Sequence, residues 1–453
     1  MAGLLDILRS GAWLTRERVR LVALGVLAAS AIGLVFLLAT SDGLNDRFGR
    51  PLGTDFSNVY SAGTYVLDGE PAAPFDPARQ YAREQVIFGQ ATPFYGWHYP
   101  PFFLGLAALL ATMPYWLALL TWQGATLGLY LWAMRAILLP SPSPAGGGSR
   151  AASARGGVSS ERSSPPPGEL RSPTSPLQGE VKKVWLTLLL ALAFPAVFIN
   201  LGHGHNGFLT AALIGGALVM LDRRPILAGI LIGCLAYKPQ FGMLIPLVLI
   251  VSGRWRVFFS AAATVTALAL AVTLAFGIEV WTAFLASTSF TQHVVLEQGG
   301  TGWYKIQSVF SWVRMWGGSV TFAYAVQGAI TLCVALGLAW LWRARVSFAI
   351  QAAALLIGTV LATPYSLDYD LMLLAPAIGF LAAEGMRRGF GPYEKTLLAA
   401  LWIVPLITRS VAETALIPLA VPVMLIAFGF LLHRAMVNTG AQLIWPFAAR
   451  PLK

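Results

Sequence analysis

Residues 54–60, with the sequence TDFSNVY, contain a carboxylate, Asp55, that could act as a general base. It follows the first long apolar run, where it could face a cavity beside that run. A carboxylate within hydrogen-bond reach of a hydroxyl accepts its proton as the oxygen attacks an electrophile. The alternative interpretation is structural, because a carboxylate just before Phe56 is also suited to cap a helical turn. The sequence alone leaves both interpretations open.

Aromatic and polar side chains accompany this carboxylate in the same long loop, residues 41–114. Tyr60 stands five residues after Asp55, and the motif HYPPF, which contains His98 and Tyr99, closes the loop. Ordered loops of this length are usually functional. We therefore expect Tyr60, His98 and Tyr99 to contribute to a substrate pocket, whereas the other acidic positions of the loop are typical of turns and helix caps.

A second polar segment, residues 200–206 with the sequence NLGHGHN, interrupts two apolar runs. His203 and His205 could present two imidazoles to a metal, but the sequence offers no third ligand. A polar break that contains glycine is more typical of the wall of a water-filled cavity at membrane depth. We therefore expect His203, His205 and Asn206 to line the substrate pocket, and we expect no metal site.

Lys238 stands between two short apolar runs, in the sequence Lys238-Pro239-Gln240. A lysine at the centre of a membrane helix costs about 2.5–3.5 kcal/mol by insertion scales, so it is usually paired or faces a cavity. The alternative is that its ammonium group extends to the membrane surface. In the functional interpretation Lys238 is a cation for an anionic lipid head group, and Gln240 lies in the same pocket.

The segment 363–370, TPYSLDYD, stands at the start of another apolar run. Asp368 is suited to cap the helix that begins there, and Asp370 lies deeper in the run. We expect Asp368, Tyr369 and Asp370 to contribute to the pocket. Further cations are expected on the same side of the membrane, namely Lys305, Arg314 and Arg409.

The composition defines what must position these residues. Of 453 residues, 57% are hydrophobic and 11% are charged, and a soluble domain carries about twice that charge fraction. The chain is therefore an all-α polytopic membrane protein, and a soluble enzyme is excluded. The formal net charge of +11 comes from short basic clusters between apolar runs, as the positive-inside rule predicts, so nucleic acid binding is not expected.

Other classes of chemistry lack their motifs. Cys234 and Cys333 are the only cysteines and both lie in apolar runs, so no disulfide framework is expected. The chain contains no P-loop, no dinucleotide-binding glycine motif and no HExxH motif. We expect no cofactor. The first apolar run lacks a small-residue cleavage site after it, so it is expected to stay as an anchor.

We expect about 12 transmembrane helices, because a crossing needs about 20 apolar residues. The basic clusters predict cytoplasmic termini and an extracytoplasmic loop 41–114 that carries juxtamembrane helices. Residues 102–113 are too short to cross and are expected to be interfacial or re-entrant. The expected crossings are residues 21–40, 115–138, 184–200, 207–221, 257–277, 319–341, 347–362, 369–384, 395–408 and 412–433, with 226–237 and 240–252 as a shorter pair.

Three parts of the chain are distinguished by composition. Residues 1–140 hold the first helices and the long loop, and residues 184–453 hold the remaining bundle. Between them, residues 141–183 are rich in Ser, Pro, Gly and Arg. Such a segment cannot bury enough apolar surface to offset its ordering entropy, so we expect a disordered cytoplasmic loop.

Taken together, TDFSNVYSAG, HYPPF, GHGHNGFLTAAL, LAGILIGCLAYKPQFG and ATPYSLDYDLMLL resemble glycosyltransferase family 87 over nearly the whole chain except 141–183. That family comprises GT-C enzymes, including polyprenyl-phosphate-mannose-dependent α-1,2-mannosyltransferases. The resemblance implies a GT-C-like bundle in a bacterial inner membrane. It also implies inverting transfer of a sugar from a polyprenyl-phosphate donor to a lipid or glycan acceptor on the extracytoplasmic face. Asp55 matches the family's proposed general base, and the four cations, Lys238 and Lys305 first, would bind the donor phosphate.

Two elements depart from the family pattern. His205 stands where relatives often have Gln in a GQxN-like element, and residues 366–370, SLDYD, stand where mannosyltransferases commonly have a Ser-Trp-x-His-His-like element. The identity of the donated sugar is therefore left open, with mannose as the candidate. A transporter or flippase of lipid-linked saccharides is the alternative, but it predicts broken helices in paired halves and charges at the midplane. A catalytically silent scaffold would not need the Asp55 loop.

Overall fold

The computed structural model describes residues 2–139 and 186–439, and these residues form helices joined by turns and loops. Within these two ranges there is no β-strand, only isolated bridges such as Ile306 with Leu367. The expectation of an all-α protein is confirmed. The segment 141–183, expected to be disordered, lies outside the described residues.

The long and short helices follow the expected apolar runs. The N-terminal part contains α1 (Ala2–Ser10), α2 (Arg16–Ala39), α3 (Thr54–Leu67), α4 (Pro77–Phe88), α5 (Leu104–Ala111) and α6 (Tyr115–Leu138). The middle part contains α8 (Pro195–His203), α9 (Gly207–Met220), α10 (Pro225–Gly233), α11 (Pro239–Gly242), α12 (Ile245–Val251), α13 (Trp255–Phe276) and α14 (Glu279–Phe290). The C-terminal part contains α15 (Val309–Met315), α16 (Val320–Arg343), α17 (Phe348–Leu361), α18 (Leu374–Arg388), α19 (Glu394–Ala415) and α20 (Ala420–Asn438).

Six of the described helices are long and apolar enough to cross a membrane, or seven if the bent pair Leu186–Leu192 and Pro195–His203 is one crossing. The pair bends by 46° where Pro195 removes a helical hydrogen bond. A polytopic membrane protein is thus confirmed, whereas the count of about 12 stays a prediction. The boundary expected between 408 and 412 was wrong: α19 continues through these polar residues to Ala415, and the chain turns at Leu416 with a φ of 59°.

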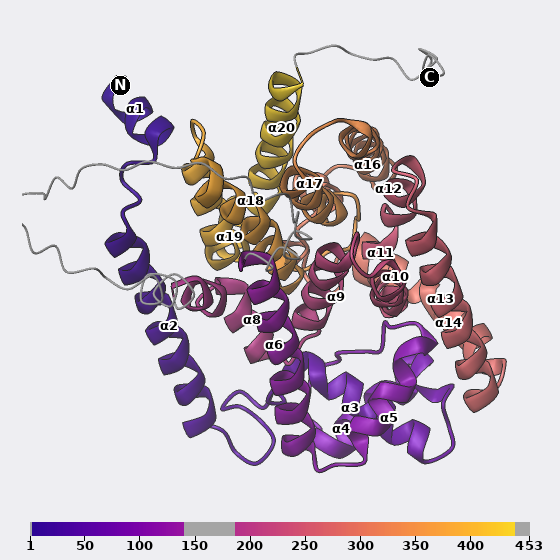
Figure 1. The fold of residues 1–453 in the computed structure, drawn as a ribbon. Helices are drawn as coiled ribbons and strands as arrows, with labels where there is room; N and C mark the ends of the chain where they lie inside the picture. The colour runs from indigo at the N-terminus through magenta and orange to yellow at the C-terminus, as the bar shows by residue number, and fades with distance from the viewer. Residues whose placement is uncertain (1, 140–185, 440–453) are drawn as a thin grey trace, which may run out of the picture.

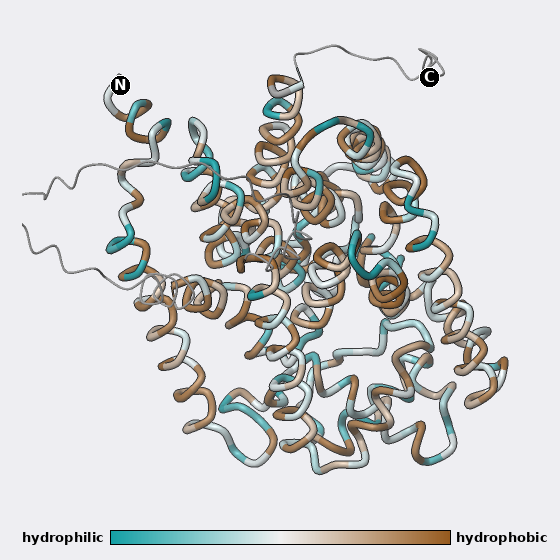
Figure 2. Tube along the Cα trace, viewed as in Figure 1, coloured by the Kyte–Doolittle hydropathy of each residue, from teal (hydrophilic) through white to brown (hydrophobic). Residues whose placement is uncertain are grey.

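The two ends of the bundle differ in content (Figure 1). The helix α1 and the end of α20 lie at one end, and α3, α4 and α5 of the long loop lie at the other. The helix α17 lies in the interior: it is buried along almost its whole length and packs on α16, α18 and α20. The helix α2 is charged in its first turns and apolar beyond them (Figure 2), and only 6% of its apolar stretch is buried, as expected for a helix that faces lipid.

The long loop is an ordered layer built on close helix packing. The helix α3 packs on α5, and a Cβ atom at Gly63 would overlap the carbonyl oxygen of Ala107. Asp76 caps α4 by accepting a hydrogen bond from the Ala78 amide at 2.9 Å. The 3₁₀ turn Pro101–Phe103 and α5 form the short helix expected in 102–113; its position relative to lipid stays a prediction.

A helix break brings Lys238 to the same layer. The helix α10 ends in a 3₁₀ turn, Cys234–Tyr237, and the chain resumes as α11 and α12 after Lys238. At the other ends of these segments, Arg254 forms an ion pair with Asp222. The start of α10 therefore lies close to the end of α12, and Lys238 stands at the break between these two segments.

Candidate active site

A cavity of about 390 Å³ lies where the start of α3, the end of the long loop, the break at Lys238 and the segment before α18 meet. Its volume is in the range of about 300–1,000 Å³ that is usual for ligand sites. Eight residues predicted from the sequence line it, from five separate segments of the chain: Asp55, His98, Tyr99, His205, Lys238, Gln240, Tyr369 and Asp370.

Asp55 lies in the first turn of α3 and caps nothing. The N-cap is Gly53, whose φ of +68° is left-handed, and no side chain accepts a hydrogen bond there. The capping interpretation of Asp55 is therefore wrong. The helix dipole favours a carboxylate in this turn, and the Asp55 side chain faces the cavity.

A histidine accompanies this carboxylate. His203 Nδ1 lies 3.7 Å from Asp55 Oδ2 and 2.6 Å from Thr54 Oγ1. Burial raises the pKa of Asp55 above its ordinary value, and the nearby His203 and Lys305 act in the opposite direction. His203 does not line the cavity itself, but its imidazole lies directly beside the carboxylate that does.

Lys238 forms a buried ion pair in the cavity wall. Its Nζ donates to Asp370 Oδ1 at 2.6 Å, and both side chains are almost fully buried. The interpretation in which Lys238 extends to the membrane surface is therefore wrong. Asp370 Oδ2 also accepts the Leu367 amide at 3.0 Å, so Asp370 both caps the 3₁₀ helix Asp368–Leu373 and holds the lysine.

Asp368 has a different role from the cap that we expected. Its Oδ2 pairs with Arg409 at 3.2 Å, and its Oδ1 accepts the amide of the next residue, Tyr369, at 2.9 Å. The cap at the start of this helix is supplied by Asp370 instead. Asp368 is buried but does not line the cavity.

The two elements that depart from the family pattern are in contact with each other. The rings of His205 and Tyr369 stack with their centroids 3.3 Å apart, and His205 Nε2 lies 3.3 Å from the Tyr99 hydroxyl. His205 Nδ1 is buried without a hydrogen-bond partner among the described residues. Buried polar atoms normally have partners, so this nitrogen is available to a bound hydroxyl group.

Asn200 connects the turn that contains His205 to the segment that contains Tyr369. Its Nδ2 donates to the carbonyl oxygens of Ala196 and Tyr369 at 2.8 and 3.0 Å, and its Oδ1 accepts the Gly207 amide at 2.9 Å. A Cβ atom at Gly207 would overlap the Asn200 side chain and the Tyr369 carbonyl oxygen. Asn206 is buried in the same turn but does not line the cavity.

The end of the long loop is held by a buried carboxylate. Glu84 accepts the amides of Tyr95 and Gly96 at 3.1 and 3.2 Å, and burial raises its pKa to about 7. His98, three residues later, has its pKa lowered to about 4 by burial, and its Nδ1 lies 2.9 Å from Thr291 Oγ1. His98 is therefore a neutral group at physiological pH.

The remaining predicted residues lie outside the cavity lining. The Tyr60 hydroxyl donates to the Met113 carbonyl at 2.9 Å, because five residues along a helix place it away from the Asp55 face. Arg314 donates to the carbonyl oxygens of Gly318 and Glu297 at 2.6 and 3.0 Å, which favours a structural role. Lys305 and Arg409 lie 5.8 and 5.7 Å from the Tyr304 ring, so these two cations gather on one aromatic side chain.

Several lining residues were missed. Asn58 stands three residues after Asp55, on the same face of α3, and its Oδ1 has no partner among the described residues. That spacing could have revealed it. Another wall is formed by polar side chains of α14 and of the π-helix Thr291–Glu297. Ser287, Thr288 and Thr291 belong to it, and nothing in the sequence of these helices marks these three residues.

No group of three or more His, Cys, Asp or Glu side chains in residues 2–139 and 186–439 is arranged to hold a metal ion. The pair of His203 and His205 is split: His203 contacts Thr54 and Asp55, whereas His205 stacks on Tyr369.

The comparison with protein families assigns a class to this helical membrane protein with its polar cavity, that of a membrane glycosyltransferase. The family model for glycosyltransferase family 87 matches residues 97–364, more than half of the chain. The chain belongs to glycosyltransferase family 87. The match includes Lys238 and both histidines of the GHGHNG turn but not Asp55 or Asp370. Searches of curated proteins and of solved structures found no significant match.

Proposed function

We propose that this family 87 protein transfers a sugar from a polyprenyl-phosphate donor to a hydroxyl of a lipid or glycan acceptor, with Asp55 as the general base. One observation carries the proposal: a carboxylate that caps nothing and a buried lysine line the same cavity. A base and a cation are the two groups that this transfer requires, because a hydroxyl must lose a proton and a phosphate must leave.

In the proposed step, the acceptor oxygen forms a bond to the anomeric carbon of the sugar while Asp55 takes its proton. The bond between that carbon and the phosphate oxygen breaks, and its electron pair leaves with the polyprenyl phosphate. This single displacement inverts the anomeric configuration. Lys238 is assigned to the growing charge on the phosphate, with Lys305 as a second cation near Asp55 and Arg409 beside it on Tyr304.

Neutral polar groups of the cavity are assigned to the sugar. His98, His205, Gln240 and Asn58 supply donors and acceptors, and Tyr99 and Tyr369 supply hydroxyl groups and aromatic faces. The low pKa of His98, about 4 because of burial, supports a neutral hydrogen-bonding role rather than a cationic one. Mannose is the first sugar to test as the donated group, because it is the common donor of the resembling enzymes.

The proposed site of reaction is the extracytoplasmic face of a bacterial inner membrane, with both termini cytoplasmic. The basic residues that flank α2, α10 and α12 support this orientation. The long loop, which carries Asp55, lies at the end of the bundle away from α1 and the end of α20 (Figure 1).

The test is transfer by the purified full-length protein in lipid nanodiscs. Radiolabelled polyprenyl-phosphate-mannose and other polyprenyl-phosphate sugars would be supplied with a bacterial lipid extract as the source of acceptors. We expect Asp55→Asn to lower the transfer rate about 10²–10⁴-fold, the usual contribution of a general base. The matched control is Asp76→Asn in the same loop, because Asn caps α4 as well as Asp does.

The outcomes separate the parts of the proposal. Transfer by wild type and Asp76→Asn that Asp55→Asn loses, with unchanged thermal unfolding, supports Asp55 as the base. Equal transfer by Asp55→Asn rejects this base but keeps the transferase. Lack of transfer from every donor, together with movement of lipid-linked sugar across reconstituted vesicles, would favour a flippase instead.

A further inference from the structure

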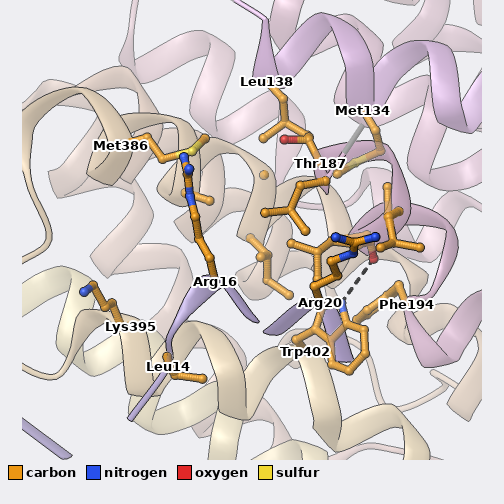
Figure 3. Close-up of a pocket in the computed structure, with 18 of the residues that line it drawn as sticks. Leu14, Arg16, Arg20, Met134, Leu138, Thr187, Phe194, Met386, Lys395 and Trp402 are labelled. Carbon is orange, nitrogen blue, oxygen red and sulfur yellow. Dashed lines mark hydrogen bonds between the residues drawn. The ribbon is translucent and has the colours of Figure 1, made fainter. Parts of the chain in front are cut away.

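A second and larger cavity, of about 1160 Å³, lies between α2 on one side and α6, α18 and α19 on the other (Figure 3). It shares no lining residue with the candidate active site. The active-site cavity borders the 3₁₀ helix Asp368–Leu373 through Tyr369 and Asp370, whereas the second cavity borders α18 from Ala375 to Met386. The two cavities therefore lie along successive helical segments of the chain.

The walls of the second cavity are apolar. Trp402 and Phe194 supply aromatic surface, and most of the remaining wall is aliphatic. Trp402 Nε1 donates to the Leu190 carbonyl at 3.2 Å, which fixes the indole in the wall. A cavity of this size exceeds the range of about 300–1,000 Å³ that suits small ligands, and its apolar walls suit hydrocarbon. The aliphatic wall contains Leu14, Leu24, Met134, Leu138, Leu186, Leu189, Leu190, Ile378 and Met386.

Three cations contribute to the lining of this cavity. Arg16 and Arg20 are one helical turn apart and therefore lie on the same face of α2, and Lys395 of α19 also contributes to the lining. Figure 3 shows the side chains of Arg16 and Arg20 among the residues that line the cavity. Within residues 2–139 and 186–439 none of these three cations forms an ion pair. Among the described residues, Glu17 is the single carboxylate in the lining.

The helix α2 lacks other support. Ala23 is the only buried residue of α2, and α8 is the helix that it contacts most among the described elements. An apolar cavity with three cations and one carboxylate between a loosely held helix and the bundle is complementary to a molecule with a hydrocarbon tail and an anionic head group.

We propose that this cavity binds one anionic phospholipid from the leaflet on the side of the N-terminus, with its phosphate held by Arg16, Arg20 and Lys395 and its acyl chains between α2 and α18. The bound lipid fills the space between α2 and the bundle and so fixes α2 in place. This inference is independent of the reaction that the other cavity performs.

The test is native mass spectrometry of the purified full-length protein, titrated with phosphatidylglycerol or with phosphatidylcholine of the same acyl chains. We expect the first phosphatidylglycerol to bind more tightly than phosphatidylcholine. A juxtamembrane Lys or Arg contributes about fivefold to binding of anionic lipid, so Arg16→Gln with Arg20→Gln should weaken the first site by about 25-fold.

Two further variants make the result specific. Arg9→Gln with Arg18→Gln removes the same charge from the same end of the chain, outside the cavity lining, and should leave the first site within threefold of wild type. Ala382→Phe keeps every charge but fills the apolar part of the cavity, and it should also lose the tight site. Thermal unfolding of each variant checks that it is folded.

Four outcomes would overturn the proposal. Equal binding of the two lipids, or equal losses in the two double arginine variants, would show general surface attraction. Unchanged binding by Ala382→Phe would show that the lipid binds outside this cavity, or that the protein chain itself fills the cavity. Displacement of phosphatidylglycerol by equimolar inorganic phosphate would identify a site for a free anion rather than for a lipid.

Discussion

The buried ion pair of Lys238 and Asp370 belongs both to the packing of the fold and to the proposed chemistry. A buried charge without its partner costs about 3–5 kcal/mol, so Lys238→Met should both abolish transfer and lower the unfolding temperature. The double variant Lys238→Met with Asp370→Asn removes both charges and keeps an acceptor for the Leu367 amide. We expect the double variant to recover most of the stability and none of the activity, measured as thermal unfolding and sugar transfer. Recovery of both would show that Lys238 is structural and does not contact the donor.

Glu84 gives a prediction for pH. Its pKa is raised by burial to about 7 from an ordinary value of 4.5, so the folded protein holds this proton more tightly than the unfolded chain. Stability from this group is therefore fully present below about pH 4.5 and is lost as the pH rises to about 7, with no further change above that.

The measurement is the difference in unfolding temperature between wild type and Glu84→Gln at pH 5, 6, 7 and 8, because groups common to both proteins cancel. Between pH 5 and 7, we expect the free energy of unfolding of the wild type to fall by about 2 kcal/mol relative to that of the variant. A difference that is constant over this range would show that Glu84 is ionised throughout and that its amide contacts, not its proton, hold residues 95–96.

At the scale of elements, the turn between α8 and α9 positions the active site through close packing. Gly207→Ala would place a methyl group against Asn200 and the Tyr369 carbonyl, whereas nothing lies within 4 Å of a Cβ atom at Gly202, five residues earlier in α8. Overpacking typically costs about 1–3 kcal/mol, and an alanine in an open helical position is neutral or stabilising.

We therefore expect Gly207→Ala to lower both the unfolding temperature and the transfer rate, and Gly202→Ala to lower neither. The paired variants are compared by thermal unfolding and by the transfer assay. Because His205 and Tyr369 stack across this turn, the transfer rate of Gly207→Ala should fall by more than its loss of folded protein explains. Equal behaviour of the two glycine variants would show that the contact between α9 and the segment before α18 does not position the site.

At the scale of the whole molecule, apolar length and basic clusters were enough to predict a polytopic helical bundle, because both are properties of single segments. The residue types of the site were also predictable where polar groups interrupt apolar runs, as at His205, Lys238 and Asp370. What the sequence could not show is pairing across the bundle. Nothing local distinguishes Arg409, which pairs with Asp368, from Arg314, which binds backbone carbonyls.

The walls contributed by α14 and the π-helix were missed for the same reason. Ser287, Thr288 and Thr291 look like ordinary helix residues until the fold sets them opposite Tyr99 and Lys238. The number of crossings also depends on tertiary packing, because α9, α17 and the segments around Lys238 are short apolar helices. Short helices can cross only when tilted, broken or held inside the bundle.

Orientation in the membrane is a property of the entire chain and can be measured with single cysteines. In a background with Cys234→Ala and Cys333→Ala, Ala82→Cys on the exposed face of α4 and Ser10→Cys at the end of α1 are both accessible. We expect a membrane-impermeant maleimide to label the first in spheroplasts of an expressing bacterium and the second only after lysis, because the basic residues in the first turns of α2 retain the N-terminus inside. The reverse pattern would place Asp55 on the cytoplasmic face, where the acceptor and the donor lipid would have to be reached from inside. Labelling of both positions in intact spheroplasts would contradict an odd number of crossings between α1 and α4, and with it the assignment of α2 as a transmembrane helix.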